Sequence, residues 1–162
     1  MTVVTARRPL LVATAGLMLG ILGFVWDTIW HSRHPGMEMT GLREVLEAHS
    51  LMLIAVAIMV AAFASAVGVV HGSRTAVLSA RAAFVGSLSM AVGFAWDSVR
   101  HVQGTESAMA HSVINAGLVV VGIGLTAALV VTRTEARVHG GLGAARCSGA
   151  IRVLLSGPRA TH

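Results

Sequence analysis

Four stretches of the chain contain no Asp, Glu, Lys, Arg or His, namely residues 9–26, 50–70, 82–96 and 112–132. A helix needs about 20 mainly apolar residues to cross a bilayer. Three stretches have about this length, and the one at 82–96 reaches it when the residues around Arg81 are included. The sequence therefore predicts an all-α, polytopic membrane protein with four transmembrane helices. We expect these helices at about residues 10–31, 46–70, 76–101 and 108–132.

The composition agrees with this fold class. Only 12% of the 162 residues are charged, whereas soluble domains carry about 25%, and the mean hydropathy is +0.77. Gly, Ala and Ser recur along every apolar stretch, which allows membrane helices to approach closely. The single cysteine, Cys147, excludes an internal disulfide and a thiolate metal cage.

The positions of the arginines predict the orientation in the membrane. They precede the first helix, flank the connection between the second and third helices, and follow the fourth helix, whereas the other two loops also carry glutamates. By the positive-inside rule, both termini are expected in the cytoplasm, with the multi-pass protein in an inner or plasma membrane. Anionic lipid is a sufficient partner for the basic tail, so we expect no nucleic-acid partner.

The domain organisation follows from these segments. We expect a cytoplasmic N-terminus at 1–9, a first helical hairpin at 10–71, a second hairpin at 76–132 and a basic, disordered cytoplasmic tail at 133–162. The first apolar run follows Arg7 and Arg8 like a signal peptide, but it ends in Trp and Asp residues instead of a small-residue cleavage site. It is therefore interpreted as a transmembrane helix.

One segment occurs twice, as GFVWDTIWH at 23–31 and as GFAWDSVRH at 93–101. Residues 16–31 align with 86–101 without a gap, and each copy is followed by Gly-x-Glu and by Ala-His-Ser. Both copies run in the same direction across the membrane. The sequence therefore predicts two tandem hairpins related as a parallel repeat.

The repeat carries the candidate site. Residues four apart share a helix face, so Asp27 lies beside His31 and Asp97 beside His101. His49 and His111 begin the returning helices at the same depth. Such sets of two histidines and one carboxylate bind zinc, iron or copper.

Two further observations refine this hypothesis. Glu38 and Glu106 lie in the outer loops, where they could support the ligands by hydrogen bonds or act as exchangeable ligands. Met37, Met39 and Met109 lie in or beside the same loops, and thioethers favour copper(I). Copper is therefore slightly favoured over iron or zinc.

Three alternatives use the same residues. The polar side chains could form the hydrated edge of the membrane, with the tryptophans as an aromatic belt. Some histidines could ligate a b-type haem in an electron-transfer subunit. The cluster could instead bind a membrane-protein partner or a second copy of the chain, as in an accessory or assembly subunit. Neither a reaction nor catalytic residues are predicted.

The order of these motifs resembles a group of uncharacterised bacterial integral membrane proteins, in which Asp-x3-His is followed by Gly-x-Asp/Glu and a histidine at the start of the next helix. The Pro-Pro pair that precedes this histidine in the group is replaced by Glu47-Ala48 and Met109-Ala110. The motif is also distantly similar to the Asp/His/His copper site in the C subunit of particulate methane and ammonia monooxygenases. The resemblance to the bacterial group, which implies a bacterial inner or plasma membrane, matches these residues: Asp27, His31, Glu38, His49, Asp97, His101, Glu106 and His111. The similarity to the monooxygenase subunit covers only the aspartate and the two histidines of each half; it implies a metal site within the membrane but no oxidation activity.

Overall fold

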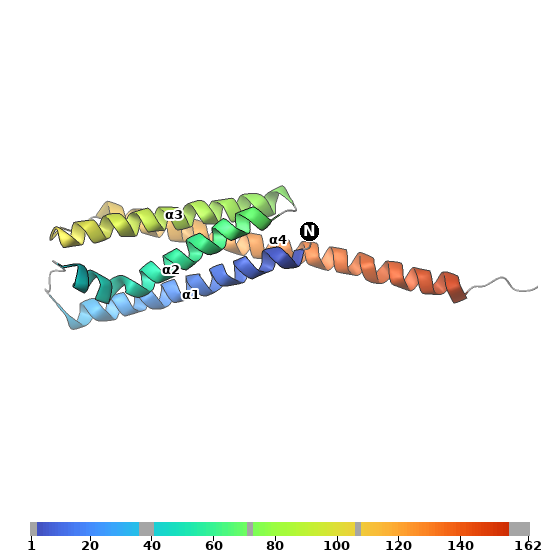
Figure 1. Cartoon of the computed structure of the whole chain (residues 1–162), viewed down its shortest axis with the longest axis horizontal. Coiled ribbons are helices and arrows are strands. Elements are labelled where there is room, and N and C mark those ends of the chain that lie inside the picture. Colours follow the sequence, from blue (N-terminus) through green and yellow to red (C-terminus); the bar gives the residue numbers. More distant parts are fainter. Residues whose placement is uncertain (1–2, 36–40, 71–72, 106–107, 156–162) are drawn as a thin grey trace, which may run out of the picture.

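The computed structural model describes residues 3–35, 41–70, 73–105 and 108–155, and within them the side chains of residues 7–138. It consists of four helices, α1 (Val3–Arg33), α2 (Leu42–Val69), α3 (Arg74–Val102) and α4 (Ala108–Leu155). No strand occurs in these ranges. Successive helices run in opposite directions and form an elongated bundle (Figure 1). The predicted all-α class is confirmed.

Each helix contains a segment that is long and apolar enough to cross a membrane. These segments are Arg7–Arg33, Leu42–Val69, Arg74–Val102 and Ala108–Val138. Large apolar side chains on the outside of the bundle, such as Leu22, Val85 and Ile123, are about 60% exposed. An extensive apolar surface is unfavourable in water but is the expected surface towards lipid. The predicted four membrane helices are thereby confirmed.

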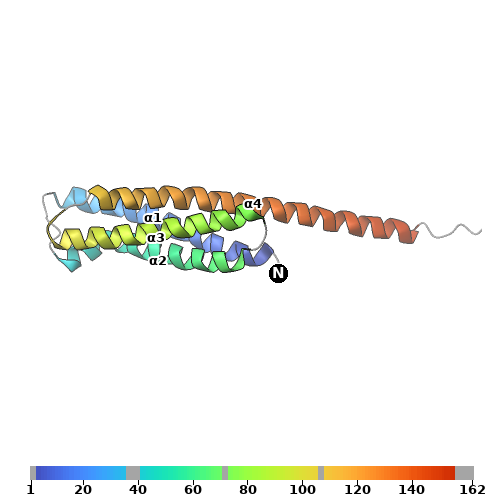
Figure 2. The same cartoon turned by 90° about the horizontal axis from the view of Figure 1, so that it is seen from above.

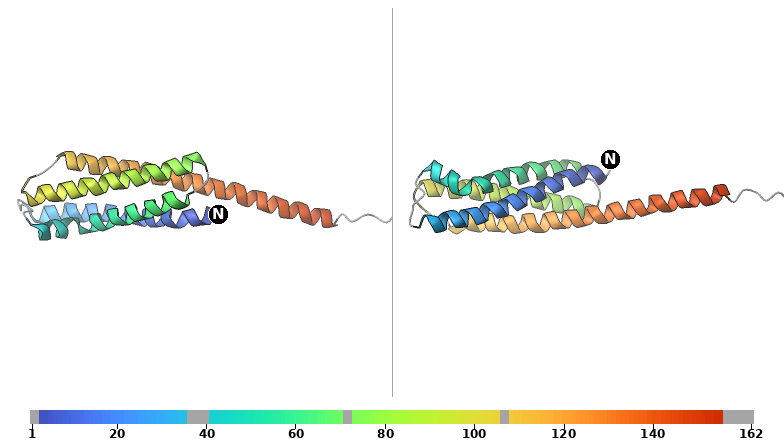
Figure 3. Two further views of the ribbon diagram at one scale, coloured as in Figure 1. Left: turned by 45° about the horizontal axis from the view of Figure 1, so that its top comes forward. Right: turned by 90° about the horizontal axis from the view of Figure 1, so that it is seen from below.

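Helix α4 differs from the prediction at its C-terminal end. We expected a helix to residue 132 and a disordered tail at 133–162, but α4 continues to Leu155 and extends beyond the bundle (Figure 3). The segment 133–155 is rich in Gly, Ala and Arg; its Ala, Arg and Leu residues favour helix, and the first proline after residue 133 is Pro158. The extension is also fixed at its base, because the backbone N–H of Ser73 donates to Glu135 Oε1 at 3.1 Å.

The helices pack as two hairpins. The contacts are most extensive between α1 and α2 and between α3 and α4; α2 also contacts α3, and α1 contacts α4 less extensively. Small residues form many of these contacts. An added Cβ at Gly117 would lie only 2.7 Å from the carbonyl oxygen of Gly86, so only glycine permits this approach of α3 and α4. Packing through small residues is how helices associate where lipid provides no hydrophobic drive.

The helix ends that matter for the site lie together. Helices α1 and α3 end, and α2 and α4 begin, at one end of the bundle (Figure 2). The end of α3 is closed by Gly104, whose φ of +67° lies in the left-handed region. The N–H groups of Gly104 and Thr105 donate to the carbonyls of His101 and Arg100, both at 2.9 Å. This Schellman cap fixes the helix end directly after His101.

Candidate metal centre

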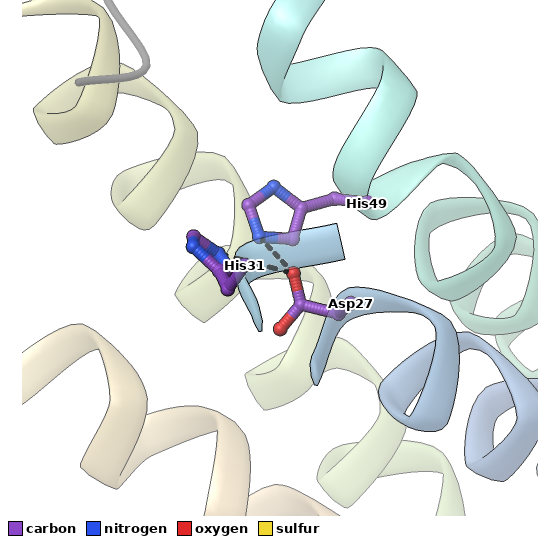
Figure 4. A group of neighbouring side chains, drawn as sticks. All are labelled: Asp27, His31 and His49. Carbon is purple, nitrogen blue, oxygen red and sulfur yellow. Dashed lines mark ion pairs between the residues drawn. The ribbon is translucent and has the colours of Figure 1, made fainter. Parts of the chain in front are cut away.

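Three side chains from the first hairpin meet at this end of the bundle. Asp27 and His31 are one turn apart on α1, and His49 reaches them from the second turn of α2 (Figure 4). Asp27 Oδ1 lies 3.4 Å from His31 Nε2 and 3.1 Å from His49 Nε2. The ligand atoms of this group all lie within 4.8 Å of one another. The three predicted side chains of the first hairpin are therefore close enough to share one ion.

The second hairpin repeats these contacts around Asp97. Its Oδ2 lies 3.3 Å from His101 Nε2, and its Oδ1 lies 3.5 Å from His111 Nε2. The compact group of three that includes Asp97, however, consists of His49, Asp97 and His101. His49 therefore belongs to both groups, which the sequence did not predict.

The four imidazoles form a continuous row across the bundle. The ring centroids are separated by 6.3 Å from His31 to His49, by 5.7 Å from His49 to His101 and by 6.5 Å from His101 to His111. The rings of His49 and His101 are stacked, with 25° between their planes. All four helices thus contribute to one polar cluster, which we call the His/Asp cluster: Asp27, His31, His49, Asp97, His101 and His111.

Burial decreases from the middle of the cluster to its edges. The side chains of Asp97 and His49 are 3% and 7% exposed, whereas those of His31 and His111 are about half exposed. Asp27 Oδ1 and Asp97 Oδ1 are buried, and neither receives a hydrogen bond despite the nearby imidazole nitrogens. A buried carboxylate oxygen without a donor is costly. Both oxygens are therefore suited to a cation.

The distances match those of atoms bound to a common ion. Two ligands, each about 2.0–2.2 Å from a tetrahedral metal, are roughly 3.3–3.6 Å from each other. The four carboxylate–imidazole distances are 3.1, 3.3, 3.4 and 3.5 Å. Three of them fall within this range, and the ligand atoms of each compact group lie within 4.8 Å of one another, so the geometry is compatible with a shared ion as well as with ion pairs.

Local packing positions the carboxylate of Asp27. The indole N–H of Trp26 donates to the carbonyl oxygen of Glu47 at 3.0 Å, which ties α1 to α2 beside the cluster. One turn before Asp27, an added Cβ at Gly23 would lie 2.8 Å from the backbone nitrogen of Met52. Both contacts set the separation between Asp27 and His49.

An apolar cavity of about 200 Å³ lies between the four helices next to the cluster. Phe24, Met52, Phe94 and Ile114 line it, and each is three residues from a member of the cluster. Except for Asn115, its lining is apolar or glycine. The cluster therefore has hydrated edges at the end of the bundle and an apolar environment on the side of the membrane interior.

Some predicted residues lie elsewhere. Glu38 and Glu106, as well as Met37 and Met39, are outside the described residues. Met109 is described but is 64% exposed. Three other methionines line the cavity, namely Met52, Met59 and Met90, and of these Met52 is one turn from His49.

His34 also lies near this end of the bundle, but it is held by other contacts. Its ring stacks on Trp30 at 4.5 Å, and its Nδ1 lies 2.9 Å from the carbonyl oxygen of Trp30. It is in neither ligand group.

No protein-family model, no curated protein and no solved structure matches the chain. The arrangement of the site is therefore the only basis for assigning a function.

Proposed function

We propose that the chain is an integral membrane protein that binds a metal ion in the His/Asp cluster. The observation that carries this proposal is the pair of buried carboxylate oxygens, each within 3.5 Å of imidazole nitrogens and each without a hydrogen bond. A cation would neutralise the carboxylates and bind the imidazole lone pairs together. Ionisable residues within membrane helices are rare and are usually functional, which favours the same interpretation.

The ligand chemistry limits the choice of ion. Imidazole and carboxylate suit zinc, iron and copper, whereas a set rich in imidazole does not suit calcium or magnesium. Copper is slightly favoured by the sequence because of the methionines in its outer loops. Met52, which lines the cavity, is also one helical turn after His49. Thioether sulfur is a ligand of copper(I).

We further propose that the two hairpins are copies of one unit. Matching contacts support this: in each hairpin an aspartate contacts the histidine four residues later and the histidine that begins the next helix. Gly23, four residues before Asp27, packs on Met52, which lies three residues after His49. Gly93, four residues before Asp97, packs in the same way on Ile114, three residues after His111. Duplication would have built both halves of the cluster at once.

The orientation remains as the arginine distribution predicts, with both termini in the cytoplasm of a bacterium and the cluster at the outer face of its inner membrane. The exposed edges of the cluster would then contact the aqueous phase outside the cell.

Elemental analysis tests the proposal. The full chain is produced with copper, iron and zinc supplied together, purified in detergent, and compared with the double variant Asp27→Ala/Asp97→Ala. We expect a metal ion in the unaltered protein and none above background in the double variant, with equal helical content by circular dichroism. Absence of metal from both proteins contradicts the proposal, and a porphyrin absorption band would assign the histidines to haem instead.

A further inference from the structure

The two compact ligand groups have one residue in common, His49, so a single His49 cannot complete both groups at once. This residue of α2 completes the group of Asp27 and His31 on α1 and also the group of Asp97 and His101 on α3. It is the most central of the four histidines, with 7% of its side chain exposed. Its stacking on His101 holds the two hairpins in register at this point.

The chemistry of imidazole limits what a shared histidine can do. A neutral imidazole carries one nitrogen with a free lone pair, and the other nitrogen carries a proton. His49 can therefore ligate one ion at a time. When the first group holds an ion through His49, Asp97 and His101 keep only the half-exposed His111, which lies outside the compact group, as a third ligand.

The two groups also differ in their access to water. The side chains of His31 and Asp27 are 45% and 19% exposed, whereas those of His101 and Asp97 are 11% and 3% exposed. An ion that arrives from water therefore meets the first group more readily. Ion–carboxylate attraction is stronger where water is excluded, which favours residence in the second group. His111 is available there as a further ligand, since its Nε2 lies 3.5 Å from Asp97 Oδ1.

We infer that the cluster holds one tightly bound ion per chain, which is taken up at one position and kept at the other. Uptake uses Asp27, His31 and His49. The ion then moves to Asp97 and His101 while its bond to His49 is kept, so that ligands of the first hairpin are replaced by those of the second. This inference rests on the proposed metal-binding function and adds its stoichiometry and direction.

Stoichiometry is the first test. The full chain in lipid nanodiscs is dialysed against buffered Zn²⁺, and bound zinc is measured by elemental analysis. We expect one ion per chain in the unaltered protein and in the control His34→Ala. In His49→Ala we expect the affinity to fall at least about tenfold.

The outcomes of this test are separable. Two ions of similar affinity per chain, or unchanged affinity in His49→Ala, would show independent sites and overturn the inference while leaving the proposed function intact. Absence of zinc from the unaltered protein, together with absence of copper and iron, removes the proposed function itself.

Kinetics test the direction. Binding of Co²⁺ is followed by its visible absorption after rapid mixing, and release is followed after addition of a chelator. We expect His31→Ala to slow uptake by about tenfold or more with little change in release, and His101→Ala to accelerate release by a similar factor with little change in uptake. Equal effects of both variants on both rates would overturn the directional part. Circular dichroism of each variant checks that the helices are intact.

Discussion

Asp97 is the side chain whose surroundings are hardest to explain without a ligand. It is 2% exposed, its Oδ1 receives no hydrogen bond, and two imidazole nitrogens lie within 3.5 Å. The i,i+4 spacing predicted the contact with His101, because that contact lies within one helix. Its burial depends on the packing of α4 against α3 and could not be derived from spacing alone.

The variant Asp97→Asn separates a metal ligand from a structural ion pair. The amide keeps the size of the side chain but removes the buried charge, so the metal-free variant should unfold at the same temperature as the metal-free parent or higher. Its metal affinity should fall at least roughly tenfold. Differential scanning fluorimetry with and without Zn²⁺ measures both effects. A lower unfolding temperature of the metal-free variant would indicate that Asp97 mainly pairs with protonated histidine.

Trp26 has a separate, positioning role. Its indole donates to the carbonyl of Glu47, so Trp26→Phe should lower the free energy of unfolding by about 0.5–1.5 kcal/mol. The matched control is Trp96→Phe, because no hydrogen bond of Trp96 occurs within the described residues. Thermal unfolding of both variants in detergent provides the comparison. Equal destabilisation by the two variants would contradict the role of the hydrogen bond.

The helices show where sequence reasoning succeeds and where it ends. Uncharged runs identified all four membrane helices, because hydropathy over about 20 residues depends on composition alone. The repeated motif also identified the ends at which the polar side chains meet. The sharing of His49 was not predictable, since it requires knowing that α2 packs against α3. The extension of α4 was missed because the Gly- and Arg-rich composition was taken to indicate disorder, although its Ala, Arg and Leu residues favour helix.

Helix separation near the cluster can be changed by a single methyl group. In Gly23→Ala the new Cβ would lie 2.8 Å from the backbone nitrogen of Met52, so α1 must move away from α2. We expect a lower unfolding temperature together with weaker Zn²⁺ binding. The control Gly122→Ala meets nothing within 4 Å and should be neutral or slightly stabilising, because alanine favours helix by about 1 kcal/mol. Unchanged metal affinity in Gly23→Ala would contradict this link between packing and the cluster.

The arrangement of the whole bundle brings the six side chains of the His/Asp cluster together at one end, whereas the other end carries arginines such as Arg7, Arg74 and Arg133. Helices α1 and α3 end beside the cluster, α2 and α4 begin beside it, and the apolar cavity separates the cluster from the rest of the bundle interior. If the cluster binds an ion as proposed, the ion would reach it from the end of the bundle where its exposed edges lie. The biological meaning of the site therefore depends on the orientation of the chain.

Cysteine labelling of intact cells tests the orientation. The parent is Cys147→Ser, which removes the native thiol. Single thiols are then placed at opposite ends of the bundle: Gln103→Cys lies at the end of α3 beside the cluster, and Thr75→Cys lies at the start of α3. Both native residues are exposed. A membrane-impermeant maleimide should label position 103 and not position 75. Labelling of position 75 alone would reverse the topology.

Metal-edge X-ray absorption of the loaded, full-length protein tests directly whether the His/Asp cluster binds the ion. We expect nitrogen and oxygen ligands at about 2.0–2.2 Å, as for imidazole and carboxylate, with the outer-sphere scattering that imidazole rings produce. Asp27→Ala/Asp97→Ala should abolish this signal. A spectrum without imidazole scattering, or one that is unchanged in the double variant, would contradict a metal centre built from these residues.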